Sequence, residues 1–430
     1  MEIIINPSRS DWQNISQRTL IDNSQLDSLC KEVFIGIKKL KDHAIRQYTH
    51  QFDKVEIDKI EVSAEEISAS INAISTELKD AINLAKDNIW KFHKSQEIVT
   101  NKITTTEGVE CWQESRPIEK VGIYIPGGTA PLFSTVLMLA IPAKIAGCKE
   151  IVLCSPPDKN GKIANEILYA AYITGVDRVF RIGGIQAIAA MTFGTESVPK
   201  VNKLFGPGNQ YVTAAKQYAT QLGVAIDLPA GPSEMLIMAD ETSEPAFIAA
   251  DLLSQAEHGK DSQVILTSTS QTLLNSVNHL VYKQMEDLPR KEIAAQSAQK
   301  SKLICLPDKQ NCIDFINEYA PEHLILAVKD VDFYISKIMN AGSVFIGHYS
   351  PESAGDYASG TNHTLPTNGY AKAYSGVNLD SFIKKITFQH ITEQGLQNIG
   401  PAIELMAEAE GLQAHKNAVS IRLKRINAKK

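Results

Sequence analysis

Val121-Gly122-Ile123-Tyr124-Ile125-Pro126-Gly127-Gly128 is the point at which the character of the chain changes. Its first five residues make a short apolar run, which is typical of a strand buried on both faces of a sheet. Two glycines close the run, and the apolar stretch that follows is predicted to be helical. A buried strand that leads through a glycine turn into a buried helix predicts one β–α unit of a parallel sheet.

The same pattern recurs downstream of this unit. Helical stretches alternate with further apolar runs, which we predict as strands over residues 150–154, 178–182, 203–205 and 224–228. This alternation predicts a parallel, doubly wound sheet with right-handed crossovers. Residues 1–20 are polar and show no strong pattern, whereas residues 22–100 are predicted to be helical, with capping-box spacing from Ser63 to Glu66.

A second α/β stretch follows the first. Its predicted strands are 233–240, 263–267, 303–306, 323–328 and 343–346, with helices at 245–255 and 311–319. The predicted fold is therefore α/β, with two Rossmann-like parallel-sheet lobes and a helical C-terminal tail. The predicted organisation is an N-terminal segment (1–20), a lobe built from 21–120 and 236–378, an inserted lobe (121–235) and a helical C-terminal segment (379–430).

Bulk composition narrows the class of protein. A chain of 430 residues is long for one hydrophobic core, and its net charge of −6 does not favour a nucleic-acid partner. The six cysteines include no CxxC pair, which argues against a zinc ribbon and a disulfide framework. Neither a basic, apolar leader nor an uncharged membrane-length run is evident, so we expect a cytoplasmic protein without a membrane partner.

Three predicted strand-to-helix turns carry glycine: Gly127-Gly128, Gly183-Gly184 and Gly206-Pro207-Gly208. Glycine lets the backbone approach a ligand closely, and the N-terminus of the following helix favours an anion. All three turns would open at the carboxyl edge of one sheet, where such folds bind ligands. None of them is GxGxxG, so a nucleotide or another small ligand is indicated without a standard dinucleotide motif. Tight turns with no ligand are the alternative.

Gln255 and His258 lie three residues apart in a stretch predicted to be helical, so an amide oxygen and an imidazole can share one face. The pair is half of a candidate metal site, and ordinary polar surface is the alternative. Asp356, in a long Gly/Ser/Pro loop, and His415, beyond the helix break at Gly411, could add ligands. Such an oxygen and imidazole set suits zinc, although glutamine is an unusual zinc ligand.

Glu322 and His323 stand side by side at the start of a predicted apolar strand. A carboxylate next to an imidazole can supply two proton acceptors, and a polar pair at a strand edge is the alternative. The loop that holds Asp356 also contains His363, and Glu410 lies just before Gly411.

Seven segments together resemble the histidinol dehydrogenase family, in that family's order and spacing. They are Tyr124–Leu132, Phe205–Asn209, Pro229–Glu234, Leu253–His258, Ala320–Leu324, Gly355–Pro366 and Ala407–His415. The resemblance implies a zinc-requiring, NAD-dependent, two-step oxidation of L-histidinol through L-histidinaldehyde to L-histidine, the final steps of histidine biosynthesis. It implies one zinc ion per subunit and a homodimer whose C-terminal segment completes the partner's site.

The resemblance also implies roles for particular residues. The acid–base pair falls on Glu322 and His323, with His323 as base for the alcohol proton and Glu322 for the water of the second step. The zinc ligands fall on Gln255, His258, Asp356 and His415. The substrate contacts fall on Ser233, Gln255, His258, His323, Asp356, His363, Glu410 and His415. NAD contacts fall on Tyr124, Gln186 and Asn209, in the inserted lobe.

Two other classes of function stay open on the sequence alone. A zinc hydrolase could use Glu322 as its base and would turn over without NAD, but the glycine turns would then have no role. A non-catalytic scaffold of the same fold would bind metal or nucleotide without turnover, and would not require Glu322 and His323.

Overall fold

The computed structural model describes residues 1–18, 24–127, 131–229 and 231–429. The chain divides into two compact units. The first comprises Met1–Gln96 and Ile118–Phe382, and the second Glu97–Pro117 and Ile383–Lys430. In the described ranges, no helix combines the length and the apolar character needed to cross a membrane.

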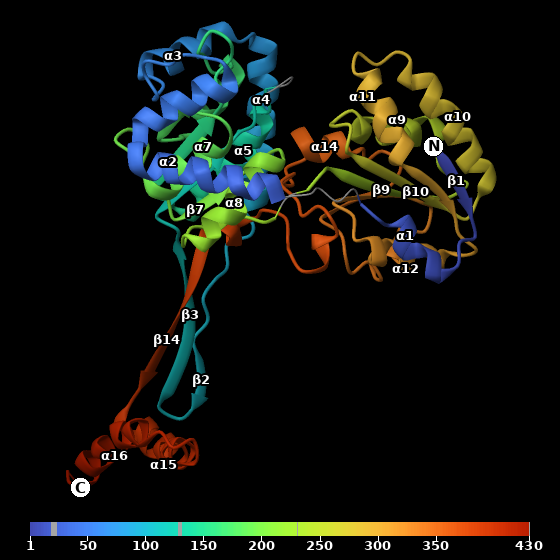
Figure 1. Cartoon of the computed structure of the whole chain (residues 1–430). Coiled ribbons are helices and arrows are strands. Elements are labelled where there is room, and N and C mark those ends of the chain that lie inside the picture. The colour runs from blue at the N-terminus through green and yellow to red at the C-terminus, as the bar shows by residue number, and fades with distance from the viewer. Residues whose placement is uncertain (19–23, 128–130, 230, 430) are drawn as a thin grey trace. The chain divides into compact units, whose positions relative to one another are not determined.

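One parallel sheet of the first unit has six strands, in the order β1-β11-β10-β9-β12-β13 (Figure 1). The strands are β1 (Glu2–Ile5), β9 (Glu234–Ala239), β10 (Gln263–Ser268), β11 (Lys302–Cys305), β12 (His323–Ala327) and β13 (Ser343–Ile346). The five predicted strands of the second α/β stretch are all present. The N-terminal segment, for which no pattern was evident, adds the sixth strand by pairing in parallel with β11.

Helices cover both faces of this sheet, as the side-chain alternation of its strands requires. On β9, Met235 and Ile237 face the core shared with α9, α10 and α11, whereas Leu236 and Met238 face α1 and α12. Figure 1 shows these helices on opposite sides of the strands. Their bounds are α1 (Trp12–Ile15), α9 (Pro245–Ala256), α10 (Gln271–Met285), α11 (Lys291–Lys300) and α12 (Lys309–Tyr319).

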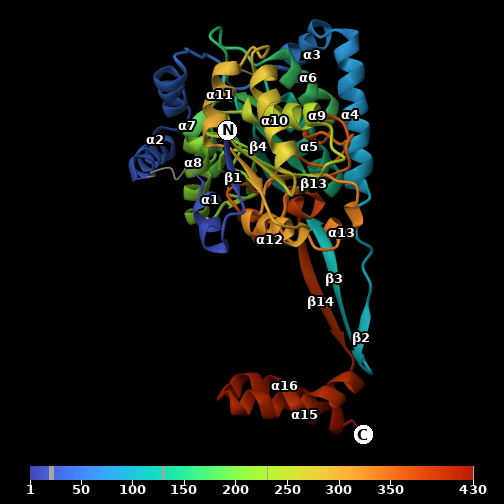
Figure 2. The ribbon, with the colours of Figure 1, turned by 90° about the vertical axis from the view of Figure 1, so that its right-hand side faces the viewer.

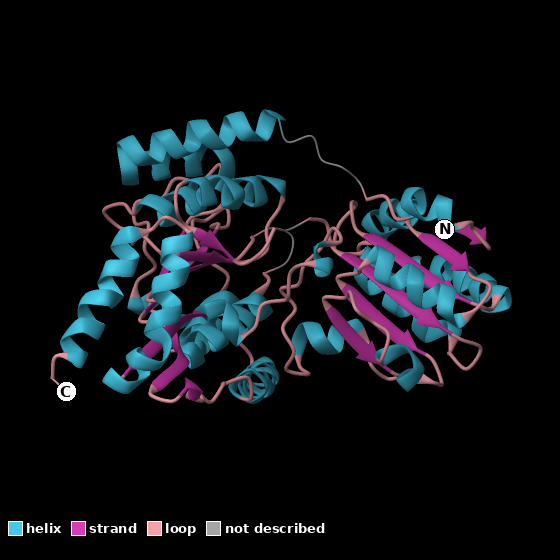
Figure 3. Ribbon diagram, turned by 90° about the horizontal axis from the view of Figure 1, so that it is seen from below, coloured by secondary structure: helices cyan, strands magenta, loops and turns pink. Residues whose placement is uncertain are grey.

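The other parallel sheet has five strands, in the order β6-β5-β4-β7-β8. The strands are β4 (Lys120–Tyr124), β5 (Glu150–Ser155), β6 (Arg178–Arg181), β7 (Lys203–Phe205) and β8 (Ala225–Ile226). Its covering helices are α5 (Phe133–Ala146), α6 (Asn165–Thr174), α7 (Gly184–Phe193) and α8 (Gln210–Gln221). The chain order reverses at β4, so the carboxyl ends of β4, β5, β6 and β7 meet where such sheets bind ligands. Figure 3 shows both sheets between layers of helices, and the α/β prediction with parallel sheets is confirmed.

The N-terminal helices pack differently from the predicted grouping, which assigned residues 21–120 to the lobe of 236–378. α2 (Ser24–Tyr48) packs on α7 and α8, and its Val33 and Ile37 lie in one core with Ala187. α3 (Ala64–Ala73) packs on α6, and α4 (Thr76–Lys94) on α5. These three helices therefore complete the lobe of the five-stranded sheet. Their sequences show an apolar face but do not show which sheet that face will cover.

The second unit contains an antiparallel sheet in the order β14-β3-β2. Its strands are β2 (Ile103–Thr106), β3 (Val109–Pro117) and β14 (Ile383–Ile391), with β14 and β3 paired along their whole length (Figure 1). The unit ends in α15 (Glu393–Ala409) and α16 (Gln413–Asn427), which pack against each other (Figure 2). The helical prediction for 379–430 is right for α15 and α16 and wrong for β14.

Candidate functional site

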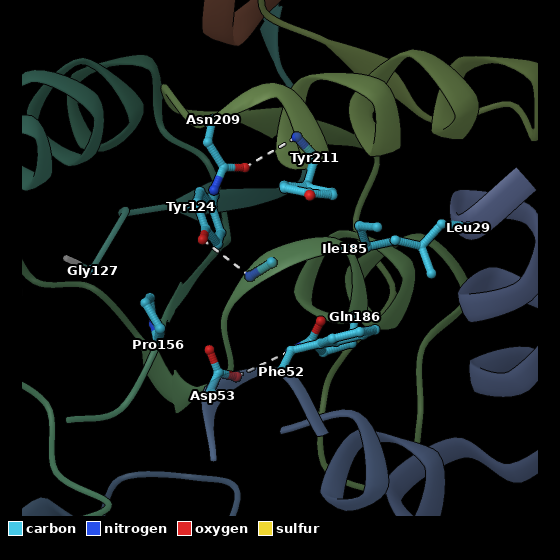
Figure 4. Close-up of a pocket in the computed structure, with 11 residues that line it drawn as sticks. Leu29, Phe52, Asp53, Tyr124, Gly127, Pro156, Ile185, Gln186, Asn209 and Tyr211 are labelled. Atoms are coloured by element: carbon cyan, nitrogen blue, oxygen red, sulfur yellow. Dashed lines mark hydrogen bonds between the residues drawn. The ribbon is translucent and has the colours of Figure 1, made fainter. Parts of the chain in front are cut away.

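A cavity of about 420 Å³ opens at the carboxyl edge of the five-stranded sheet (Figure 4). Tyr124, the last residue of β4, is buried on its wall, and its hydroxyl oxygen accepts a hydrogen bond from the Gly184 N–H at 3.1 Å. Gly184 has φ +58°, a left-handed conformation that favours glycine, at the start of α7. The second predicted glycine turn therefore lies in the wall of a ligand-sized cavity.

Gln186 of α7 reaches the same cavity beside Asp53. Its Nε2 donates to Asp53 Oδ2 at 3.2 Å, while its buried Oε1 has no hydrogen-bond partner among the described residues. Burial raises the pKa of the Asp53 carboxyl to about 6. Asp53 ends a π-helical turn, Thr49–Asp53, that follows α2. Sequence reasoning missed Asp53, because only the packing of α2 on α7 brings this turn to the sheet edge.

Asn209 caps α8 on the opposite wall of the cavity. Its Oδ1 accepts hydrogen bonds from the N–H groups of Tyr211 and Val212, at 3.1 and 3.2 Å. Gly206, in the turn before it, has φ +123°, and a Cβ there would collide with the carbonyl oxygen of Tyr124. All three residues predicted to contact NAD thus line one cavity. Of the first predicted glycine turn, Gly127 lines the cavity and Gly128 lies outside the described residues.

A separate group of polar residues gathers in the lobe of the six-stranded sheet. Gln255 lies at the end of α9 and is wholly buried, yet neither Oε1 nor Nε2 has a hydrogen-bond partner in the described part of the chain. α9 ends at Ala256, with Glu257 as its cap. His258 therefore lies just past the helix, whereas the sequence predicted it within the helix. Burial, and the charge of Arg290, lower the pKa of the His258 imidazole.

Glu322 and His323 lie where β12 begins, between β9 and β13, and both are buried. The Glu322 carboxylate accepts a hydrogen bond from the Glu234 N–H, at 3.0 Å from Oε2. His323 Nε2 lies 3.8 Å from Asp356 Oδ1. Burial raises the pKa of Glu322 well above its ordinary value, and burial lowers the pKa of His323 to about 3. The pair is therefore a buried group rather than an exposed strand edge.

The long loop predicted around Asp356 contains a short helix, α14 (Glu352–Tyr357), which packs against α9. His363 beyond it is fixed through both ring nitrogens. Nδ1 lies 2.9 Å from the Asp356 carbonyl oxygen, and Nε2 lies 3.0 Å from Thr135 Oγ1. Burial raises the pKa of Asp356 to about 7 and lowers that of His363 to about 4. Removing water from these side chains has a free-energy cost that a bound cation or substrate would offset.

The orphaned amide of Gln255 makes the group suitable for a metal ion. A buried amide without a partner is costly, and an ion bound by Oε1 would remove that cost. His258 and Asp356 add a nitrogen and an oxygen, which is a donor set that zinc accepts. In the ranges that the structure describes, no group of three or more His, Cys, Asp or Glu side chains could hold a metal by itself.

The remaining predicted residues divide between the units. Ser233 directly precedes β9 in the first unit and is partly buried. Glu410 and His415 belong to the second unit, on either side of Gly411, whose φ of +72° marks the predicted break between α15 and α16. The first unit contains all the predicted metal, acid–base and substrate residues except these two.

Two further groups were missed, the buried carboxylate of Glu352 and the half-buried guanidinium of Arg18. Glu352 lies within 3.1 Å of His323, and Arg18 forms an ion pair with Glu234. Glu352 stands four residues before Asp356, a spacing that places both on one helix face once the loop is known to contain α14. For Arg18 the sequence held no signal.

A ligand cavity at the edge of one parallel sheet, together with a buried histidine–carboxylate group beside another, is typical of a two-lobed α/β enzyme. The chain belongs to the histidinol dehydrogenase family, whose model matches residues 16–423. The resemblance noted in the sequence is thereby confirmed.

Individual relatives agree over nearly the whole length. Histidinol dehydrogenase from Bacteroides fragilis is 57% identical over 426 residues, covering 99% of this chain and 100% of that protein. The chloroplastic histidinol dehydrogenase of Arabidopsis thaliana is 50% identical, covering 98% of this chain and 91% of that protein. The crystal structure of histidinol dehydrogenase from Elizabethkingia anophelis is 59% identical, with a TM-score of 0.98 and 99% of each chain covered.

Proposed function

We propose that this protein oxidises L-histidinol through L-histidinaldehyde to L-histidine, with NAD as oxidant and zinc as a required metal. The observation that carries the proposal is the buried trio Gln255, Glu322 and His323, with Asp356 beside His323, in a chain whose full-length relatives bear the name histidinol dehydrogenase.

The metal and substrate are assigned to the buried group. Gln255, His258, Asp356 and His415 are the proposed zinc ligands. Bound zinc would supply a positive centre that grips the imidazole and amine nitrogens of the substrate, and bound NAD would accept the hydride in each oxidation. Ser233 and His363 line the substrate's place, and Glu410 pairs with its ammonium group.

The first oxidation requires a base for the alcohol proton, and His323 takes this role. Its imidazole is held neutral by burial, so it can accept the hydroxyl proton as the hydride leaves the same carbon. The product is an aldehyde, still in the site, and the proton rests on His323.

The second oxidation adds water to the aldehyde carbon, and Glu322 takes the water's proton. Because burial raises the pKa of Glu322, its carboxylate is a stronger base than that of an exposed glutamate. The second hydride then leaves the hydrated carbon, and a carboxylate forms. Tyr124, Gln186 and Asn209 are the proposed NAD contacts, supported by their shared cavity.

The second unit enters as a proposed dimerisation segment. Glu410 and His415 would complete the site of a partner subunit, where His415 would join the three proposed zinc ligands of that subunit's first unit. The cytoplasmic location stays a prediction, which cell fractionation would test.

The test is NADH formation from histidinol and NAD by the purified protein, with and without a chelator. Chelation should abolish turnover, and added zinc should restore it. The absence of chelator-sensitive NADH would refute the proposal. Metal-dependent turnover of another substrate without NAD would instead favour a zinc hydrolase, and bound metal without turnover a scaffold.

A further inference from the structure

Glu352 is a buried carboxylate that has no role in the two oxidation steps proposed above. It is the first residue of α14 and only 1% exposed. Its Oε2 accepts a hydrogen bond from Ser254 Oγ at 3.0 Å. Its Oε1 has no hydrogen-bond partner among the described residues. A buried, half-satisfied carboxylate costs free energy, so a specific role is expected.

The free oxygen of Glu352 faces the imidazole of His323. Oε1 lies 3.1 Å from Nδ1, without the alignment of a formed hydrogen bond. Catalytic hydrogen bonds are often loose before substrate binds and tighten in the complex. Glu322 Oε2 is farther from the same nitrogen, at 3.7 Å, and already accepts the Glu234 N–H. Glu352 is therefore the carboxylate best placed to accept a hydrogen bond from the Nδ1–H group of His323.

The other contacts of His323 hold the ring in this orientation. Its backbone lies in β12, a strand paired on both sides, with β9 and β13. The Phe345 ring packs against the imidazole, with centroids 5.9 Å apart, and a Cβ on Gly355 would collide with Phe345. With Nδ1 directed at Glu352, Nε2 is turned to the side of Asp356, the proposed metal ligand.

We propose that Glu352 is a positioning residue for His323, an inference that rests on the proposed function. Its carboxylate accepts the Nδ1–H of the neutral imidazole and so selects the tautomer with a bare Nε2. Nε2 then takes the alcohol proton in the first oxidation. Once that proton has arrived, the negative charge of Glu352 stabilises the imidazolium. No bond to carbon is made or broken by Glu352, and it keeps no proton at the end of the step.

A competing explanation is structural. Glu352 and Asp356 share α14, so the loss of Glu352 could displace a metal ligand and reduce every activity together. The two explanations differ in their targets. Loss of a positioning residue would slow only the transfer of the alcohol proton in the first oxidation. Displacement of a metal ligand would lower the zinc content and slow both oxidations.

The experiment compares Glu352→Gln and Glu352→Ala with the wild-type full-length, zinc-loaded protein. Glutamine keeps the shape and an accepting oxygen but lacks the charge, and alanine lacks both. Zinc content, the KM for histidinol and the rates of NADH formation from histidinol and from added L-histidinaldehyde are measured separately. Glu286→Gln, on an exposed glutamate, is the matched control.

We expect kcat with histidinol to fall by roughly 10²-fold in Glu352→Ala and by less in Glu352→Gln, since general base catalysis of this kind contributes about 10²–10⁴. KM, zinc content and the oxidation of added aldehyde should stay close to wild type. The solvent deuterium isotope effect should rise with histidinol only, because proton transfer becomes the slower event.

Other results would overturn the inference. Unchanged turnover in both variants removes any role for Glu352, and equal loss of both oxidations or of zinc assigns it to structure. If neither variant folds, Ser254→Ala weakens the hold on Oε2, and an undiminished first oxidation in that variant overturns the proposal. Wild-type protein that makes no NADH from histidinol would refute the proposed function itself, which is a distinguishable result.

Discussion

At the scale of single residues, the proposed base Glu322 is linked to a part-buried ion pair between Arg18 and Glu234. Arg18 binds the Glu234 carboxylate with Nε and with Nη2, the latter at 2.9 Å, and Nη2 also donates to the Tyr319 carbonyl oxygen at 2.7 Å. Its guanidinium lies 4.1 Å above the centre of the Tyr319 ring. Because the Glu234 N–H binds Glu322, this network fixes the backbone that holds a proposed base.

Replacing Arg18 by methionine should therefore destabilise the protein. Burial raises the pKa of Glu234 and the Arg18 hydrogen bond lowers it, so removal of Arg18 leaves a buried carboxylate uncompensated. The expected loss is about 3 kcal/mol in the free energy of unfolding, measured by urea denaturation. Glu234→Gln in the same chain should recover part of it, since no buried charge then remains.

The matched control is Arg9→Met. Arg9 also pairs with a carboxylate, Asp314, but on the surface, where such pairs contribute little. Equal destabilisation by the two methionine substitutions would contradict the role given to Arg18.

His93, which is not one of the proposed metal ligands, should make the free energy of unfolding depend on pH. It is fully buried, with Nδ1 2.8 Å from the Ile89 carbonyl oxygen and Nε2 3.3 Å from Asn362 Nδ2. Burial lowers the pKa of its imidazole, so as pH falls the unfolded chain binds a proton before the folded one does. Stability should accordingly fall as pH drops below the ordinary histidine pKa. The difference in unfolding free energy between about pH 7.5 and about pH 5.5 should be smaller in His93→Gln than in wild type. An unchanged difference would contradict the assignment.

At the scale of elements, the turn between β7 and α8 connects local geometry to the proposed NAD cavity. Gly206→Ala must place a Cβ against the Tyr124 carbonyl oxygen and keep a left-handed backbone. Gly223→Ala makes a clean comparison, because φ there is +84° and nothing lies near its Cβ. Gly223→Ala should cost about 1 kcal/mol in unfolding free energy, the backbone cost alone. Gly206→Ala should cost more and should also raise the KM for NAD. Equal effects of the two on stability and KM would contradict this account.

The existence of most elements could be predicted from the sequence, whereas their partners could not. Continuous apolar runs such as 150–154 and 234–239 predict strands, because helices cover both faces of a parallel sheet and every side chain of such a strand is then buried. α14 escaped prediction, since six residues within a Gly/Ser/Pro loop carry no periodic signal. β14 is mostly exposed or half-buried and pairs with β3, far away in the sequence, so neither its face nor its partner is visible locally.

The candidate site divides in the same way. Gln255, His258, Glu322, His323 and Asp356 could be named from motifs, because side chains with that chemistry stand in recognisable segments. Asp53, Arg18 and Glu352 could not be named, since each reaches its neighbours only through packing between distant segments. Motifs indicate the reacting groups, and tertiary contacts reveal the residues that hold them.

At the scale of the whole molecule, the residues of the proposed site are divided between the two compact units. The first unit holds the proposed bases and three proposed zinc ligands, and the second holds Glu410 and His415. If each second unit serves the partner subunit, the defects of two inactive variants lie in different halves of the site. A mixed dimer then contains one intact site.

Mixing His323→Ala with His415→Ala subunits should therefore restore activity that neither variant has alone. After unfolding and refolding together in equal amounts, half of the dimers are mixed and each has one working site, which predicts roughly a quarter of the wild-type NADH rate from histidinol. His323→Ala mixed with Gln255→Ala is the control. Both defects lie in the first unit, so every site stays defective and no activity should return. If His415 acted within its own chain, the first mixture would be as inactive as the control. The absence of NADH formation in both mixtures would therefore refute a site shared between subunits.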